Sequence, residues 1–207
     1  WSAQGKFEQM HDRLRAQWRE REERADSPSA AILDSQSTRS SPQGGDSGYD
    51  AGKKVKGRKR SLIVDTLGLL LAVSISAASV QDRDAADDAV AYSKEKYPSL
   101  STLFVDSAYA GKWAQRTHQL HAIDVQVIRG PNNRRTGQWH SEQGDLFSVE
   151  PVQTGFVVMP KRWVVERTHA WNERARRLIM HHDRLFAVSE AWVWLAEARI
   201  LARRLTT

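Results

Sequence analysis

Three carboxylates from separate parts of the chain are of a type and placement that could do chemistry together. Asp106 ends the short apolar run in TLFVDSAYAG, Asp34 ends the apolar run in AAILDSQS, and Glu166 lies within KRWVVERTHAW. A strand that ends on one acid can hold a metal-binding carboxylate rigidly. Phosphoryl transfer uses two divalent cations roughly 3.5–4 Å apart, and Mg²⁺ needs only a few such oxygen ligands. The three acids fit metal-assisted phosphoryl transfer but do not single it out.

Each of these acids also has an ordinary structural explanation. An Asp after a strand is often a turn residue that bonds its own backbone, and Asp65, at the end of SLIVD, could take the place of Asp34. Glu166 lies opposite the apolar stripe of its predicted helix and four residues after Arg162, where a solvated ion pair is equally expected. If Glu166 is catalytic, the site must lie on the polar side of that helix.

Composition narrows the possible metal ligands and the possible location of the protein. The 207 residues include no cysteine, which removes disulfides, thiol nucleophiles and cysteine zinc sites together. The seven histidines show no spacing typical of a metal site. No apolar run approaches the roughly 18 residues that a membrane-spanning helix needs, and the sequence shows no basic, apolar, small-residue leader, so we expect a cytoplasmic protein with no membrane partner. Because the chain opens at Trp1, we also expect a fragment.

Cationic residues gather in two places. The chain has 31 Lys and Arg against 25 Asp and Glu, and six of the eight residues 53–60 are basic. The late helix that contains Glu166 provides a second group. Clusters of this kind favour contact with phosphate backbones, where affinity comes largely from counterion release. The predicted DNA-binding residues are Lys53, Lys54, Lys56, Arg58, Lys59, Arg60, Arg162, Arg167, Arg174 and Arg177.

The hydrophobic pattern predicts an α/β layered domain with a mixed sheet. Phe7, Met10, Leu14 and Trp18 recur at helical spacing and predict an amphipathic helix over residues 3–24. The polar stretch 35–50 is predicted to be a loop, and the long polar stretch 130–155 another. Strands are predicted over 31–33, 61–66, 69–79, 102–106, 124–128 and 156–159, and further helices over 81–97, 111–121, 163–180 and 188–205.

Four blocks of sequence extend this interpretation. ILDSQS, GYDAGKKVKGRKRSLIVDTLGLLLAV, LFVDSAYAG and GFVVMPKRWVVERTHAWNERARRL together resemble the catalytic region of DDE transposases of bacterial insertion sequences, of the type called insertion sequence group five. The resemblance covers nearly all of residues 31–205. It implies an RNase H-like mixed sheet flanked by helices, with Asp34, Asp106 and Glu166 as the three catalytic, metal-binding acids. Their separations along the chain are ones that such enzymes tolerate, because loops and inserts vary in length.

The same resemblance assigns some neighbours of Glu166. Arg162 and Glu166 match the Arg and Glu of the family's Tyr-Arg-Glu-Lys signature. Met159 stands where the Tyr is expected and Glu173 where the Lys is expected, so no role is transferred to those two positions.

The resemblance implies a transposase that cleaves DNA strands and transfers them at insertion-sequence ends, with two Mg²⁺ ions that Mn²⁺ can replace. Its expected partners are double-stranded DNA, as terminal inverted repeats and target, and a second copy in a homodimer on DNA, associated with the nucleoid. Residues 1–24 are expected to be the remainder of a truncated N-terminal DNA-binding region. Residues 25–207 are expected to form the RNase H-like DDE catalytic domain. The alternatives are a truncated, inactive remnant that only binds DNA, and an RNase H-like nuclease.

Overall fold

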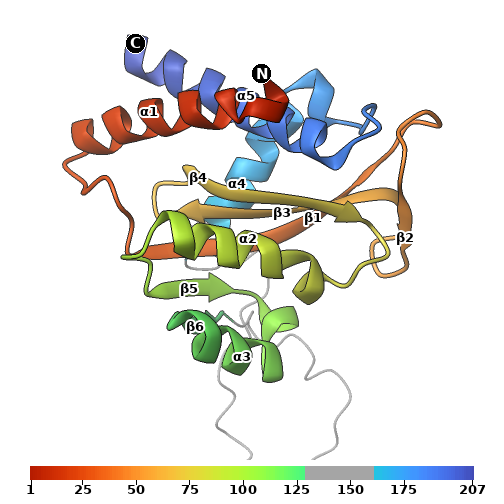
Figure 1. Ribbon diagram of the computed structural model, residues 1–207, viewed down its shortest axis with the longest axis horizontal. Helices are drawn as coiled ribbons and strands as arrows, with labels where there is room; N and C mark the ends of the chain where they lie inside the picture. The colour runs from red at the N-terminus through yellow and green to blue at the C-terminus, as the bar shows by residue number, and fades with distance from the viewer. Residues whose placement is uncertain (129–160) are drawn as a thin grey trace, which may run out of the picture.

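A mixed sheet forms the centre of the computed structural model, which describes residues 1–128 and 161–207 (Figure 1). The strands run in the order β2-β3-β1-β5-β6, with β4 also paired to β3. β1 is antiparallel to β3 and parallel to β5, which is in turn parallel to β6. These strands are β1 (Ala30–Arg39), β2 (Gly48–Asp50), β3 (Val55–Asp65), β4 (Leu70–Ala77), β5 (Thr102–Val105) and β6 (Asp124–Val127).

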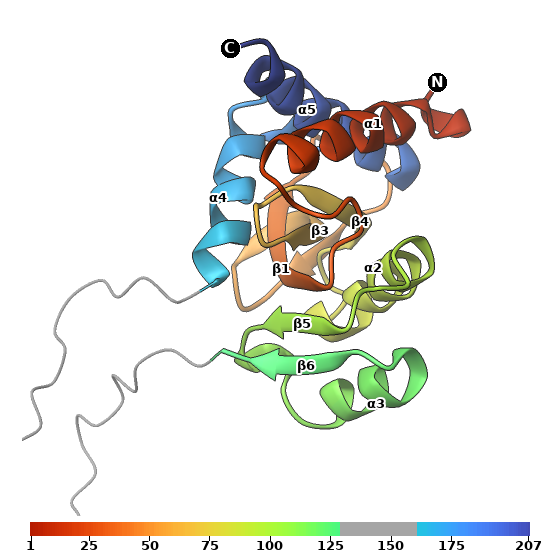
Figure 2. The same ribbon diagram turned by 90° about the vertical axis from the view of Figure 1, so that its left-hand side faces the viewer.

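Helices cover both faces of this sheet, with α2 on one side and α4 on the other (Figure 2). Together with the mixed strand directions, this arrangement confirms the predicted α/β class, a mixed sheet flanked by helices. None of the helices in the described residues is both long and apolar enough to cross a bilayer. The helices are α1 (Lys6–Arg21), α2 (Asp82–Lys96), α3 (Lys112–His121), α4 (Arg162–Glu173) and α5 (Phe186–Thr206).

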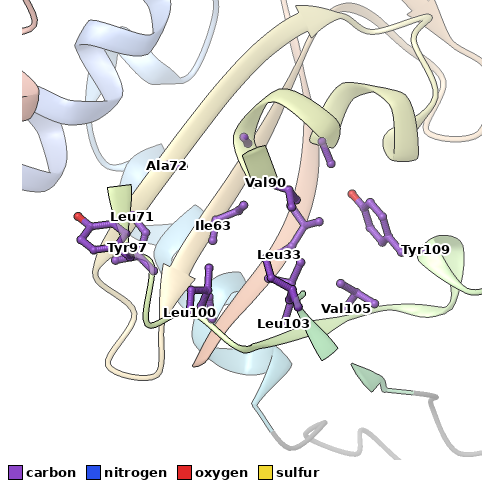
Figure 3. Packing of buried hydrophobic residues seen from close by; sticks show 14 of the residues in the cluster. Leu33, Ile63, Leu71, Ala72, Val90, Tyr97, Leu100, Leu103, Val105 and Tyr109 are labelled. Atoms are coloured by element: carbon purple, nitrogen blue, oxygen red, sulfur yellow. The ribbon is translucent and has the colours of Figure 1, made fainter. Parts of the chain in front are cut away.

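Two apolar clusters hold the layers together, because successive side chains of a strand point to opposite faces. Leu33, Ile63 and Leu103 pack against Val90 of α2 and against Tyr109 (Figure 3). On the opposite face, a second cluster joins the strands to α4 and α5 through Ile32, Leu62, Phe104, Val165 and Val193. Adjacent residues of β1 therefore face different helices, which decides where Asp34 points.

β1 and the late helix differ in length from the sequence-based prediction. β1 continues to Arg39 through part of the predicted loop 35–50, because its polar half pairs with the basic half of β3, for example Thr38 with Arg58. The helix predicted over 163–180 ends at Glu173, and a single 3-10 turn at Arg176–Leu178 follows. The predicted loop 130–155 and strand 156–159 lie outside the described residues.

α1 exists where the sequence predicts a helix, but it turns a different face inward. The buried side chains are His11, Arg15 and Arg19, whereas Met10 of the predicted apolar stripe is 39% exposed. The two Nη atoms of the buried Arg15 guanidinium donate hydrogen bonds to Asp26. α1 lies beside α5 in both views of the ribbon (Figures 1 and 2). Polar contacts, as well as apolar ones, thus hold this helix in place.

Candidate active site

Asp34 and Asp106 are brought together by the register of two parallel strands. β1 pairs with β5 in one constant register, which sets Ala30 opposite Thr102 and Ile32 opposite Phe104. The pairing ends there, but the same register continued by two residues leads to Asp34 and Asp106, at the roughly 4.8 Å spacing of neighbouring strands. Because side chains alternate along a strand, Asp34 points to the same face as Ile32, which is the one that α4 covers.

α4 adds an arginine and the third acid to this position. The Nη2 atom of Arg162 lies 3.7 Å from Asp34 Oδ1, 3.9 Å from Asp106 Oδ2 and 3.5 Å from Glu166 Oε1. Arg162 and Glu166 are four residues apart and so share one face of the helix. The structure therefore brings the three predicted acids together around one guanidinium group.

The acids have different surroundings. Burial raises the pKa of Asp34 to about 6, and the neighbouring Asp106 adds to this rise while Arg162 opposes it. His169 Nε2 is 3.5 Å from Asp34 Oδ2, and burial lowers the pKa of His169 to about 3, so this imidazole is neutral at pH 7. Glu166 is the most solvent-exposed of the three acids, with 48% of its side chain accessible.

Asp106 combines the two roles that the sequence left open. Its Oδ1 atom accepts a hydrogen bond of 2.8 Å from the backbone N–H of Ala108, which caps the short 3-10 turn Ser107–Tyr109. Its Oδ2 atom faces Arg162. The turn contact therefore fixes the carboxylate and leaves one oxygen for the site.

The donor set suits a hard divalent cation. Its oxygens are carboxylate oxygens, which Mg²⁺ and Mn²⁺ prefer. Within residues 1–128 and 161–207, no three acidic or histidine side chains are already arranged to hold a metal ion. The positive guanidinium of Arg162 instead lies among the carboxylates. The cation that the structure places among the three acids is therefore the guanidinium of Arg162.

An open depression of about 330 Å³ gives access to this site. Asp34, Glu166 and His169 line it, together with Lys53 from the segment before β3. Lys53 Nζ donates a hydrogen bond of 2.9 Å to the carbonyl oxygen of Ser35. A cation therefore stands at the edge of the acidic site.

Half of the basic cluster before and within β3 is buried. Arg58, Lys59 and Arg60 are 0%, 3% and 0% exposed. Arg58 donates hydrogen bonds to three backbone carbonyls and a serine hydroxyl, Lys59 pairs with Asp82, and Arg60 donates to the carbonyl oxygen of Leu178. These contacts leave no surface for a phosphate, so the predicted role of the three residues in DNA binding is wrong.

The other predicted DNA-binding residues divide into two groups. Arg162 lies among the acids, and the half-buried Arg167 stacks on Trp163 and Trp171 and donates a hydrogen bond to the Leu67 carbonyl oxygen. The exposed residues are Lys53, Lys54, Lys56, Arg174 and Arg177.

Asp65, the alternative to Asp34, lies elsewhere. It is 0% exposed, pairs with Arg19 of α1, and accepts hydrogen bonds from the backbone N–H groups of Leu67 and Leu69. Asp65 therefore closes the β3–β4 turn, and the alternative that placed it in the acidic site is wrong.

His169 is a site residue that sequence reasoning missed. It follows Glu166 by three residues, so helical spacing places both on the side of α4 that meets Asp34. That spacing was available in the sequence. The burial that keeps the imidazole neutral was not, because it depends on packing against β1 and β3.

A family match accords with this geometry. A family model described as a transposase DDE domain matches residues 25–201. Among solved structures, the chain is similar to one described as the Mos1 mariner paired end complex with Mn, with 8% sequence identity and a TM-score of 0.35. That likeness covers 95% of this chain and 60% of the other, so this chain spans less than two thirds of its length. No match was found among curated proteins.

Proposed function

Because the chain belongs to the family of transposase DDE domains, we propose that it cleaves DNA strands and transfers the freed ends to target DNA. The observation that supports this most strongly is the convergence of Asp34, Asp106 and Glu166 on Arg162. Three acids from two strands and a helix do not meet in this way to close a local turn. Their meeting point also opens to solvent at the depression beside Lys53.

In this proposal, Asp34, Asp106 and Glu166 hold two Mg²⁺ ions, which Mn²⁺ can replace. Bound there, the ions would activate the attacking oxygen and stabilise the leaving oxygen. Asp34 must lose its proton to become a ligand, which its raised pKa delays until the pH exceeds about 6. Arg162 keeps the three negative charges close together before cations bind. Lys53 offers a positive charge to the DNA strand at the mouth of the site.

The proposed partners are double-stranded DNA, as terminal inverted repeats and as target, and a second copy of the chain in a homodimer on DNA. Lys53, Lys54 and Lys56 lie on one exposed segment, and Arg174 and Arg177 on another. These five exposed cations remain proposed phosphate contacts. The division into a DNA-binding remainder at 1–24 and a catalytic domain at 25–207 also remains a proposal.

The test is a nicking and strand-transfer assay on duplex DNA in Mg²⁺ or Mn²⁺. Asp106→Asn should lower the cleavage rate by about a thousandfold, because several kcal/mol of transition-state stabilisation depend on the metal ligands. Asp88→Asn, which changes an exposed acid on α2, is the matched control and should retain the rate. Undiminished cleavage by Asp106→Asn would overturn the proposal.

A second candidate, an inactive remnant that only binds DNA, is favoured by one observation. The guanidinium of Arg162 occupies the space between the three acids, where the described residues form no ready-made metal cluster. This candidate predicts DNA binding with no cleavage in either metal, even at a pH well above 6. A nuclease of the same fold would instead cleave without preference for element ends.

A further inference from the structure

An arginine-lined groove lies at the opposite end of α4 from the acids. Its volume is about 850 Å³, and its walls come from residues 171–178 and from residues 192–204 of α5. We call it the arginine groove, after the six arginines that line it: Arg174, Arg176, Arg177, Arg199, Arg203 and Arg204.

These arginines have no ion-pair partner among the described residues. No acidic residue of residues 1–128 and 161–207 lines the groove. Elsewhere in the described residues, four arginines do form ion pairs: Arg15, Arg19, Arg116 and Arg162. A cluster of like charges repels itself and costs stability. The concentration of positive charge therefore calls for a polyanionic partner.

Two acids act on Arg204 from outside the groove, Glu197 of α5 and the exposed Glu22 after α1, but neither forms an ion pair with it or lines the groove. Glu197 of α5 attracts Arg204, yet its side chain is only 3% exposed and it does not line the groove. Burial raises the pKa of Glu197 to about 8, so its carboxyl group is mostly protonated at pH 7. The positive charge at the surface of the groove therefore remains available to a ligand.

The floor of the groove strengthens its attraction for negative charge. Arg177 stacks on Trp192 at 5.0 Å and Arg204 on Trp171 at 4.3 Å, which holds two guanidinium groups in place. The apolar side chains between the two walls lower the local dielectric constant. A cleft lined by one sign of charge over apolar walls focuses its field on an incoming ion. Arginine forks also match the geometry of phosphate oxygens.

We propose that the arginine groove binds the phosphate backbone of double-stranded DNA beyond the point of cleavage. This inference rests on the proposed function. Glu166 lies within α4 and Arg174 directly follows its last residue, which corresponds to about 12 Å along the helix axis. A duplex that follows α4 would place the groove roughly four base pairs from the acids, at about 3.4 Å per pair. The groove would thus anchor the flanking DNA.

The first test measures duplex binding by fluorescence anisotropy over a range of salt concentrations, with no divalent metal present. The full chain is compared with the Arg199→Ala and Arg203→Ala double variant, on a labelled duplex of about 30 base pairs. The variant should bind at least about tenfold more weakly, and the slope of log K against log salt should become shallower by about two.

The matched control removes the same charge elsewhere. Arg24, in the segment after α1, and Arg83, on α2, are both exposed and lie outside the groove. The Arg24→Ala and Arg83→Ala double variant should change the slope by less than half as much as the groove variant does. Equal slopes and affinities for the two double variants would overturn the proposal, because binding would then follow net charge alone. Unfolding temperatures of all proteins establish that each variant is folded.

A second measurement does not depend on weakened binding. The chain contains no cysteine, so Arg176→Cys introduces a unique site for a photo-crosslinking probe in the groove. Crosslinks to the duplex are expected from this position and not from Arg83→Cys. Absence of crosslinks from the groove would contradict the proposal. So would displacement of the duplex by polyglutamate at a lower concentration than by unlabelled duplex, since that would indicate an acidic protein partner.

Failure here can be separated from failure of the proposed function. Binding is measured without metal, and Asp106→Asn should bind the duplex with the affinity of the unmodified chain. Groove-dependent binding by a chain that never cleaves DNA would overturn the proposed function and support the groove. If the unmodified chain cleaves DNA but the groove variant binds the duplex as tightly as the control variant does, only the proposed role of the groove is overturned.

Discussion

The negative charge of Asp34 lowers the stability of the folded protein, because the carboxylate is largely buried and lies beside a second carboxylate. Its pKa of about 6 reflects burial first, then the charge of Asp106, with Arg162 acting in the opposite direction. A folded protein that keeps such a group near neutral pH gives up stability at that position. Functional sites commonly have this property, because a strained or charged arrangement is retained for what it binds.

This loss of stability can be measured as a pH dependence of the free energy of unfolding. Between pH 3.8, the ordinary pKa, and about 6, the folded state binds more protons at Asp34 than the unfolded state does. The free energy of unfolding therefore falls as the pH rises through this window. Asp34→Asn should remove the effect and raise the free energy of unfolding at pH 7 by about 1–3 kcal/mol.

Urea denaturation without divalent metal, from pH 5 to pH 7, tests this. The advantage of Asp34→Asn should narrow as the pH is lowered, whereas Asp88→Asn should show no such trend. Equal stability of Asp34→Asn and the unmodified chain at pH 7 would contradict the electrostatic account of the site.

At the scale of elements, strand register and buried charge decide the arrangement. The constant register between β1 and β5 places Asp34 beside Asp106. A buried ion pair between Arg19 and Asp65 joins α1 to the β3–β4 turn. Removing one member of such a pair leaves an uncompensated charge inside the protein, which costs far more than the pair contributes.

Asp65→Asn should therefore lower the free energy of unfolding by about 3–5 kcal/mol. The asparagine keeps an oxygen for the N–H groups of Leu67 and Leu69, so the loss reports the charge of Arg19. Adding Arg19→Met should recover part of the loss. Cleavage per folded molecule should remain unchanged, because Asp65 is outside the acidic site. A cleavage defect as large as that of Asp106→Asn would show that this placement is wrong.

At the scale of the whole molecule, α1 is integrated into the fold. Lys96 of α2 pairs with Glu8 and Asp12, at 2.5 and 2.8 Å. His11 stacks against Trp194 of α5, with ring centroids 5.1 Å apart. These contacts join α1 to helices on both sides of the sheet. The segment 1–24 therefore contributes to the stability of the domain whatever its role in DNA binding.

Deleting residues 1–24 should lower the midpoint of thermal unfolding by about 10 °C or more, given about 2–4 °C per kcal/mol for a domain of this size. Calorimetry or circular dichroism measures the shift. Met10→Ala and Gln17→Ala, on the outer face of α1, should change the midpoint little. An unchanged midpoint after the deletion would show that residues 1–24 form a separable unit, as the proposed domain division expects.

The sequence by itself determined the class of fold, most of its elements and the three acids. Apolar periodicity is local, so the α2, β5, α3, β6 and α5 segments were predicted to within a few residues. Asp34, Asp106 and Glu166 were identified because a resemblance to known blocks joined positions that spacing alone left ambiguous. Polar strands have no comparable signal, and β1 beyond Asp34 was therefore missed.

Only the tertiary structure decided which charges face water and which meet one another. Arg58, Lys59 and Arg60 look like a surface cluster in sequence, but all three are buried and contact groups from other segments inside the protein. The tertiary structure also places Arg162 among three acids. The six arginines of the arginine groove, by contrast, have no acid of the described residues beside them in the groove lining. The reason is physical: burial of a charge depends on the groups that compensate it, and these come from distant segments.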